Sequence, residues 1–378
     1  MFTKSITLFR ILGFEIKVDF TWIFLAILIS WSLAVGFFPD QYPGLSTTMY
    51  WLMGVEGAIG LFISIALHEL GHSLVARRFG IKIKDITLFI FGGVANMEGE
   101  PKKPRDEFLM AIAGPITSGI LAILFFGLHL GARATVGPYP PLEVLGYLAW
   151  LNSILALFNM VPAFPLDGGR VLRAILWDWK KDLRWATRIS SAMGSGFGLL
   201  LIVLGIFAFM SGNVLGGVWW FMIGMFVRTA SAMSYKQLLL RRALEGEPVS
   251  RFMQTEVIGV RPTLSLRDLL EEYVYQYHFK TYPVFDGPRL VGCVTTRGFK
   301  SVPKTEWDLR TVSEILEPCN EENSIGPDED AMVALSKMNR TGRGRLMVVE
   351  GGELLGIIAL KDLMEFFSVK LDLEEKTP

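Results

Sequence analysis

The stretch YWLMGVEGAIGLFISIALHELGH, residues 50–72, decides the fold of this chain. From Tyr50 to Leu67 the only charged side chain is Glu56, so the segment is apolar enough to cross a membrane as a helix. His68 and His72 lie one turn apart on the same helical face and can reach one metal ion. Because histidines and a carboxylate are costly to keep inside a bilayer, they indicate a functional metal site rather than a chance motif.

Glu69 lies between the two histidines in sequence. A carboxylate at this position can take a proton from water at the metal. The segment therefore predicts hydrolytic metal chemistry within a membrane.

The composition supports a membrane protein. Of the 378 residues, 51% are hydrophobic, and the mean hydropathy is +0.40, which is too apolar for an ordinary soluble protein. The net charge is zero, and the basic residues form no patch typical of nucleic-acid binding. Cys293 and Cys319 show neither metal-ligand spacing nor a disulfide framework. The first twenty residues are mixed in polarity, so no cleavable signal peptide is expected.

Six apolar stretches are long enough to span about 30 Å of hydrocarbon as helices. They lie near residues 20–38, 50–76, 107–130, 143–162, 188–211 and 214–233. Seven Lys or Arg fall in residues 77–106 and six in 170–188, whereas 39–48 and 210–213 hold none and 128–142 holds only Arg133. Since loops rich in Lys and Arg stay on the cytoplasmic side, both termini are expected in the cytoplasm.

This topology puts the two histidines below the membrane surface. Arg77 and Arg78 mark the cytoplasmic end of the second span, and His68 precedes Arg77 by nine residues. At 1.5 Å per residue, His68 lies about 13 Å below that surface. A hydrolytic site at this depth requires a polar pocket that holds water and is walled off from lipid.

Two short segments have the pattern of β-hairpins. Residues 85–98 are two apolar runs separated by Gly92 and Gly93, and Leu8–Val18 reads as two strands with a turn at Gly13. Open strand edges are not stable in lipid, so the 85–98 hairpin is expected to pack against the helices.

A third metal ligand is needed, because catalytic zinc sites have three protein ligands and an open position. The best candidate is Asp167, which follows Pro162 and Pro165, two residues that break the fourth apolar helix. Gly168 and Gly169 are expected to permit a sharp turn here. A broken helix that lines a cavity can point a carboxylate inward. Alternatively, Asp167 is a solvated residue at a helix end, balanced by Arg170, and the residues alone leave both interpretations open.

The paired motifs carry a family resemblance. HELGH at the end of an apolar helix, followed by NMVPAFPLDGGR at residues 159–170, resembles the site-2 protease family of intramembrane zinc metalloproteases. The segments FGGVANM (91–97) and AGP (113–115) are similar to recurring elements of its bacterial and archaeal members. The resemblance covers about residues 5–235, and this chain matches the family at every catalytic position.

The resemblance assigns roles to individual residues. It implies that His68, His72 and Asp167 bind one zinc ion and that Glu69 is the general base. It further implies that Asn159 steadies the substrate or the developing oxyanion. It also implies that the hairpin around Gly92 and Gly93 guides an unwound strand of a transmembrane substrate. Strand addition to a free sheet edge is a known mode of peptide binding.

The C-terminal third contains an internal repeat. After Tyr235 the hydropathy falls, and two blocks, residues 282–295 and 345–359, share a strand-turn-strand pattern with a period near 64 residues. Each block follows a helical pattern, at Leu266–Tyr277 and Asp330–Met338. The repeat resembles a tandem pair of CBS domains, which commonly bind adenine nucleotides such as ATP or AMP in the cleft between repeats.

The ribose-binding signature of CBS domains is a Thr followed three residues later by Asp. The first repeat has Thr295 but Gly298, and the second has Ala359 but Asp362, so each signature is half-present. Asp362 is the one position carried over as nucleotide-binding. The alternative is that the pair acts as a dimerisation or docking module without a ligand.

The predicted architecture is a polytopic α-helical membrane protein with six transmembrane helices and small β-hairpins, plus a cytoplasmic α/β CBS pair. The domains are expected at 1–235 (membrane metalloprotease), 236–249 (linker), 250–310 and 311–370 (CBS repeats) and 371–378 (tail). The predicted function is zinc-dependent hydrolysis of peptide bonds within or next to transmembrane segments of proteins in the cell membrane. A divalent-metal transporter regulated by the CBS pair and a catalytically silent binding protein are the alternatives. A transport path needs several intramembrane ligand sites, and this sequence supplies one.

Overall fold

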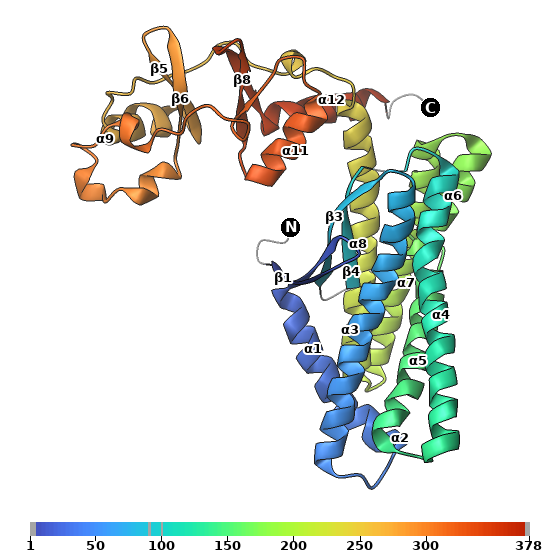
Figure 1. Ribbon diagram of the computed structural model, residues 1–378. Coiled ribbons are helices and arrows are strands. Elements are labelled where there is room, and N and C mark those ends of the chain that lie inside the picture. Colours follow the sequence, from blue (N-terminus) through green and yellow to red (C-terminus); the bar gives the residue numbers. More distant parts are fainter. Residues whose placement is uncertain (1–4, 90–91, 100, 375–378) are drawn as a thin grey trace. The chain divides into compact units, whose positions relative to one another are not determined.

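The computed structural model describes residues 5–89, 92–99 and 101–374. The chain divides into two compact units, Met1–Lys236 and Gln237–Pro378. The first unit contains long apolar helices and one sheet, and the second contains two small α/β halves (Figure 1).

The expectation of six apolar spans is confirmed. Six helical segments are long and apolar enough to cross a membrane within the described residues. The first combines α1 (Phe20–Ser32), a π-helical turn (Leu33–Phe37) and α2 (Phe38–Gln41). The others are α3 (Thr47–Arg78), α4 (Pro104–Val136), α5 (Pro140–Asn159), α7 (Leu183–Met210) and α8 (Val214–Leu244). A shorter amphipathic helix, α6 (Asp167–Lys180), separates α5 from α7.

Side-chain caps define where several helices begin. Asp19 accepts a hydrogen bond from the Thr21 backbone N–H at the start of α1, and Ser46 accepts one from Met49 at the start of α3. These caps satisfy backbone donors that have no partner inside the helix. At the other end of the fourth span, α5 stops at Asn159, three residues before the predicted end, because the chain turns ahead of Pro162.

The two predicted hairpins join into one sheet. Its strands are β1 (Ser5–Ile11), β2 (Phe14–Asp19), β3 (Lys82–Phe89) and β4 (Gly92–Glu98), in the order β1-β2-β3-β4. The β1–β2 and β3–β4 pairs are antiparallel, and β2 and β3 pair in parallel. The helices between β2 and β3 thus form the connection between two neighbouring strands. Phe14, Ile16 and Val18 alternate along the buried face of β2 and pack with Leu70 of α3.

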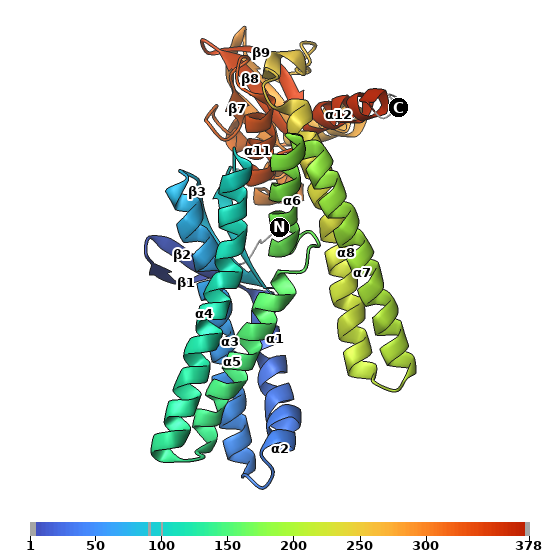
Figure 2. The same cartoon turned by 90° about the vertical axis from the view of Figure 1, so that its right-hand side faces the viewer.

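The helix α3 is the centre of the membrane unit. It packs against α1, α4 and α5, and the sheet lies along its upper half in Figure 1. The helices α7 and α8 run side by side in both views (Figures 1 and 2). Their backbones approach closely at small residues, a common arrangement between membrane helices; these are Gly198 and Gly205 on α7 and Gly217 and Gly224 on α8.

The second unit has two halves with matching strands, so the predicted repeat is confirmed. In the first half, β5 (Thr281–Asp286) pairs with β6 (Arg289–Thr295), and in the second, β8 (Arg345–Glu350) pairs with β9 (Glu353–Ala359). The short β7 (Ser324–Ile325) pairs in parallel with β8. The helices are α9 (Leu266–Asp268), a π-helical turn (Leu269–Val274), α10 (Tyr275–Tyr277), α11 (Ala331–Thr341) and α12 (Leu360–Glu374). Short 3₁₀ turns occupy Val249–Arg251, Gly298–Ser301, Lys304–Glu306 and Val312–Ile315.

The segment that precedes each half in the sequence packs into the other half. Val249 and Phe252 lie in the hydrophobic core of the second half, whereas Val312 lies in the core of the first. Two matching backbone pairings accompany the exchange: Gln254 pairs with Ile357 of β9, and Glu317 pairs with Cys293 of β6. The two halves are therefore interlocked parts of one compact unit.

Candidate metal centre

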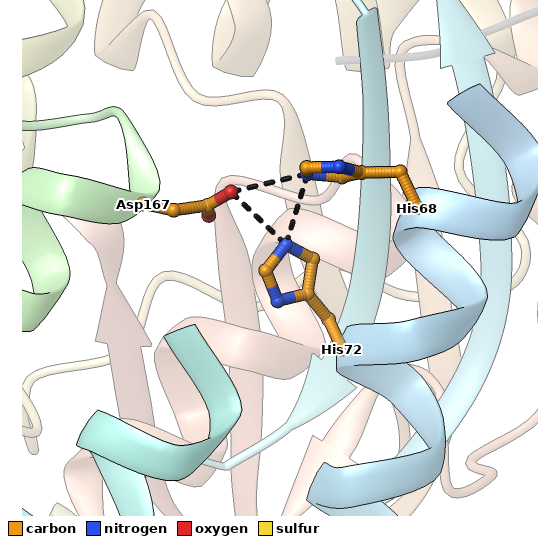
Figure 3. A group of neighbouring side chains, drawn as sticks. All are labelled: His68, His72 and Asp167. Atoms are coloured by element: carbon orange, nitrogen blue, oxygen red, sulfur yellow. Dashed lines mark hydrogen bonds and ion pairs between the residues drawn. The ribbon is translucent and has the colours of Figure 1, made fainter. Parts of the chain in front are cut away.

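Three side chains able to bind a metal ion converge in the membrane unit, from two helices that are far apart in the sequence (Figure 3). His68 and His72 lie on α3, and Asp167 is the first residue of α6. Asp167 Oδ2 lies 3.1 Å from His68 Nε2 and 3.2 Å from His72 Nε2, and the two Nε2 atoms are 3.2 Å apart. All three residues are buried. Of the two interpretations of Asp167, the structure therefore supports the inward-pointing carboxylate.

The spacing fits a zinc ion. Two ligands at about 2.05 Å in tetrahedral geometry are about 3.3 Å apart, close to the three separations in this group. Carboxylate oxygen and imidazole nitrogen are both common zinc ligands. Within the described part of the chain, this is the one group of three such side chains close enough to share an ion.

The helix α4 fixes the orientation of both imidazole rings. His72 Nδ1 lies 2.7 Å from the Met110 carbonyl oxygen, so this nitrogen donates and Nε2 keeps its lone pair. His68 Nδ1 lies 2.8 Å from Ser118 Oγ. A second hydrogen bond of this kind sets ring orientation and tautomer at metal-binding histidines.

Between these contacts, Gly114 of α4 faces both rings. A Cβ atom at Gly114 would lie 2.1 Å from His72 Nε2 and 2.6 Å from His68 Nε2. The two imidazoles therefore converge over a position that has room only for glycine. Met110, Gly114 and Ser118 are spaced by four residues, so they lie on one face of α4.

A non-helical segment between α5 and α6 leads directly into Asp167. Between Asn159 and Asp167 the chain is non-helical, with a cis peptide bond at Phe164-Pro165. Gly168 and Gly169 do not form the expected sharp turn, since they lie in the first turn of α6 without positive φ. Because these two glycines have no side chain, the backbone of the preceding segment can pack closely against the start of α6. A Cβ at Gly168 would lie 2.3 Å from the Met160 carbonyl oxygen, and one at Gly169 would lie 2.2 Å from the Phe164 nitrogen.

Strand β4 passes directly over Glu69. A Cβ at Gly93 would lie 2.4 Å from Glu69 Cγ, so only glycine permits this approach. The predicted hairpin is present, but Gly92 and Gly93 begin β4 rather than forming the turn. Residues 90–91, between β3 and β4, lie outside the described residues. Gly92 has φ +129° and open space at its Cβ position.

Two other predicted residues are not brought into this group. The Asn159 side-chain N–H donates to the Leu155 carbonyl of its own helix at 3.0 Å. Asp362 lies in the second unit, where it accepts hydrogen bonds from Gln254 Nε2 at 2.8 Å and from the Ala359 backbone N–H at 2.9 Å. Both polar groups are thus occupied by neighbours in the structure.

In each half of the second unit, the signature residue that is present forms a hydrogen bond with a side chain from the segment packed against that half. Glu317 accepts a hydrogen bond from the Thr295 hydroxyl at 3.1 Å, and Gln254 takes the corresponding role at Asp362. Arg343 pairs with Glu317. Nearby polar side chains line a cavity of about 510 Å³; they are Glu321, Glu322, Arg340, Thr341 and Arg343.

Sequence reasoning missed the contributions of α4. Met110 and Ser118 carry no motif that marks them as partners of the histidines, and Gly114 was noted only as part of AGP. Their four-residue spacing is the one signal in the sequence. The buried ion pair between Glu107 of α4 and Arg173 of α6 was missed as well.

Two protein-family models match this chain. Residues 56–134 and 131–203 match the model of peptidase family M50, and residues 249–302 and 312–369 match the model of the CBS domain. The zinc metalloprotease Rip3 of Mycobacterium tuberculosis is 33% identical over 367 residues, which cover 97% of this chain and 93% of Rip3. The zinc metalloprotease MJ0392 of Methanocaldococcus jannaschii is 32% identical and is covered to 98%, as is this chain.

A solved structure also matches. The site-2 protease from Methanocaldococcus jannaschii is 33% identical, and the match covers 61% of this chain and 94% of that chain with a TM-score of 0.43.

Proposed function

The chain belongs to peptidase family M50, and on this basis we propose that His68, His72 and Asp167 hold its catalytic zinc ion and that Glu69 is the general base. The chain is a zinc metalloendopeptidase of the site-2 protease type, a multi-pass membrane protein with tandem CBS domains that acts on membrane proteins. The observation that carries the residue assignment is the convergence of three ligating atoms at 3.1–3.2 Å from helices about 95 residues apart in sequence.

Each residue around the site has its own proposed role in peptide hydrolysis. His68, His72 and Asp167 would hold the zinc ion, which when bound would polarise the scissile carbonyl and lower the pKa of nearby water. Glu69 directly follows His68 on α3, so its carboxylate is placed to accept the proton of the attacking water and pass it to the leaving amine. Ser118 and the Met110 carbonyl hold the imidazoles in one orientation throughout. Asn159 is proposed to steady the substrate, which requires its amide to leave the Leu155 carbonyl.

We assign the substrate strand to the free edge of β4. A helical segment hides its carbonyls in its own hydrogen bonds, so it must unwind before attack. The sheet order puts β4 at an edge, and Gly93 brings that strand against Glu69. A segment that pairs with β4 gains backbone hydrogen bonds beside the general base. The open space at the Cβ position of Gly92 and the close approach to Glu69 that Gly93 allows support this role.

Replacement of the two glycines tests this assignment. Gly93→Val puts a side chain into the space of Glu69, and Gly92→Val places a β-branched residue at φ +129°, a strained conformation. Both variants are expected to lose cleavage while they keep zinc. Val94→Ala on the same strand serves as the control. Cleavage at the wild-type rate by the double Gly92→Val/Gly93→Val variant would contradict the assignment.

The main test separates a protease from a metal transporter. The full chain and Glu69→Gln are purified, their zinc content is measured, and both are incubated with a panel of single-span substrates. The wild type is expected to cleave and Glu69→Gln to keep zinc but lose cleavage, whereas His68→Ala loses zinc. Zinc flux into liposomes without cleavage of any substrate would favour the transporter. The family match gives that alternative no support.

For the CBS pair, we propose binding of ATP or AMP with Asp362 at the ribose. The CBS match over residues 249–302 and 312–369 and the position of Asp362 at the start of α12 support it. Titration calorimetry on the full chain is expected to show binding that Asp362→Ala weakens at least about tenfold. Absence of binding by both nucleotides would leave a docking module. Homodimerisation through the CBS pair is tested by light scattering at graded concentrations.

The proposed topology keeps both termini and the CBS pair in the cytoplasm, supported by the loop charges. The proposed domain limits are those given by the sequence, 1–235, 236–249, 250–310, 311–370 and 371–378. The division at Lys236 supports the first limit, although α8 itself continues to Leu244. Protease access to a tag at each terminus in right-side-out and inside-out vesicles tests the orientation.

A further inference from the structure

A buried ion pair connects α4 to the helix that carries Asp167. Arg173 Nε on α6 donates to Glu107 Oε1 on α4 at 2.6 Å, and a second guanidinium N–H contacts the same oxygen. Glu107 is 3% exposed and Arg173 is 7% exposed. The two helices therefore share a buried charge pair.

Arg173 also contacts Phe164, which lies in the non-helical segment before Asp167. Its guanidinium carbon lies 5.1 Å from the centre of the Phe164 ring, a cation–π contact. Phe164 is three residues before Asp167, and its carbonyl accepts a hydrogen bond from Ser231 of α8. One side chain thus holds α6 to α4 and steadies the non-helical approach to the aspartate.

Stability alone does not account for such a pair. Desolvating two charges costs about as much as their attraction returns, and apolar replacements are often neutral or stabilising. A directional contact, in which two guanidinium N–H groups meet one carboxylate oxygen, instead fixes how two elements lie against each other. Here those elements are α4, which orients both imidazoles through Met110 and Ser118, and α6, which supplies the third ligand.

We propose that Glu107 and Arg173 are positioning residues of the metal centre. The pair aligns α6 with α4 so that the Asp167 carboxylate meets the two imidazole nitrogens at ligand spacing. Metal sites tolerate errors of about 0.2 Å in ligand position, and Asp167 comes from a different helix than the histidines. This inference rests on the proposed zinc site. The helix α4 contacts both parts of that site, the two imidazoles and, through Glu107, the helix that carries Asp167.

Zinc affinity of the purified full chain, measured by competition with a chelator, tests the proposal. Glu107→Gln and Arg173→Met are expected to lower the affinity by about 10- to 100-fold, as changes behind metal ligands typically do. The visible spectrum of the Co²⁺-loaded chain is expected to change in both variants, because it reports coordination geometry. Arg173→Lys is expected to recover part of the affinity, since it keeps the charge but not the planar contact with Phe164.

A matched control breaks another ion pair of α4, one in which the carboxylate is buried and the arginine, Arg133, is exposed. Glu143 of α5 accepts two hydrogen bonds from Arg133, at 2.8 and 2.9 Å. Arg133 lies nineteen residues beyond Gly114, about 28 Å along the helix, whereas Glu107 lies seven residues before it, about 10 Å away. Glu143→Gln is expected to leave zinc affinity and the Co²⁺ spectrum unchanged.

If the single variants do not fold, the double variant Glu107→Gln/Arg173→Met is used to test the proposal. It leaves no unpaired buried charge, so it is expected to fold. A double variant that folds and binds zinc within about twofold of the wild type, with an unchanged Co²⁺ spectrum, overturns the proposal. A wild-type chain that binds no zinc contradicts the proposed function itself, which is a different outcome.

Discussion

Gly114→Ala adds one methyl group at the point where the two imidazoles meet. The new Cβ would lie 2.1 Å from His72 Nε2 and 2.6 Å from His68 Nε2, whereas ordinary contact begins at 3.4 Å. The His72 ring must therefore move by about 1.3 Å, several times the roughly 0.2 Å that a metal ligand tolerates. Its Nδ1 is held at the Met110 carbonyl, so the ring cannot move without losing that hydrogen bond. We expect zinc affinity to fall by about 100-fold or more, which is about 2.7 kcal/mol.

The same helix provides the control. Gly119 of α4 has nothing within 4 Å of its Cβ position, so Gly119→Ala adds the same methyl group in open space. Alanine is the better helix former by about 0.5–1 kcal/mol, so this variant is expected to be at least as stable as the wild type. Zinc affinity by chelator competition and cleavage of a single-span substrate are measured for both variants.

The expected result is loss of zinc and of cleavage in Gly114→Ala and wild-type behaviour in Gly119→Ala. Circular dichroism shows whether both variants keep their helices. If folded Gly114→Ala bound zinc as tightly as the wild type, the arrangement of the two rings over α4 would be wrong.

Three further predictions concern other parts of the molecule. Ser118→Ala removes the partner of His68 Nδ1 at 2.8 Å and is expected to lower zinc affinity about tenfold; unchanged affinity in the chelator assay would contradict a role in ring orientation. Burial raises the pKa of Cys293 to about 11, and Cys319 is exposed, so at pH 8 the folded chain should react with one equivalent of maleimide and Cys319→Ser with none until it is denatured. Asp85, 4% exposed in β3, accepts hydrogen bonds from Lys17, Thr87 and Asn96. Burial alone raises the pKa of Asp85, but these bonds outweigh it and hold the pKa below the usual value. The stability they give is full above about pH 4 and is lost as the pH falls through the lowered pKa. Asp85→Asn should thus cost about 1–3 kcal/mol at pH 7 and show a weaker fall in melting temperature on acidification; a melting temperature equal to that of the wild type at pH 7 would contradict this.

The sequence predicted the helical frame and the nearness of His68 and His72 from strong local signals, whereas for Asp167 the residues alone left two interpretations open and the family resemblance favoured one. The apolar run before His68 predicts a span, the four-residue spacing predicts a shared metal, and Pro162 and Pro165 predict a break that can turn a carboxylate inward. In the second unit, the repeat of about 64 residues predicted the two matching strand pairs, β5–β6 and β8–β9.

The contacts that α4 and α6 make around His68, His72 and Asp167 could not be predicted in the same way. In a membrane helix both the lipid-facing and the protein-facing sides are apolar, so hydropathy does not tell which face of α4 meets the histidines. The partnership of Glu107 with Arg173 joins residues 66 positions apart, and neither lies in a motif. Their charges within or beside apolar segments were the available signal, and it indicates burial without naming the partner.

The order of strands in the sheet could not be predicted from the sequence either. Both hairpins were predicted from local patterns, but the parallel pairing of β2 with β3 joins segments separated by two spans, and no local pattern encodes it. The same holds for Gly92 and Gly93. A glycine pair between apolar runs is typical of a turn, whereas here the two glycines begin β4, and Gly93 lets the strand approach Glu69.

The zinc coordination of the purified chain, measured by X-ray absorption at the zinc edge, tests the central claim most directly. The account predicts nitrogen and oxygen neighbours at about 2.0–2.1 Å, with the outer-shell scattering of two imidazoles that disappears in a His68→Ala/His72→Ala variant. Sulfur neighbours at about 2.3 Å, or a spectrum that the double variant leaves unchanged, would place the metal elsewhere and contradict it.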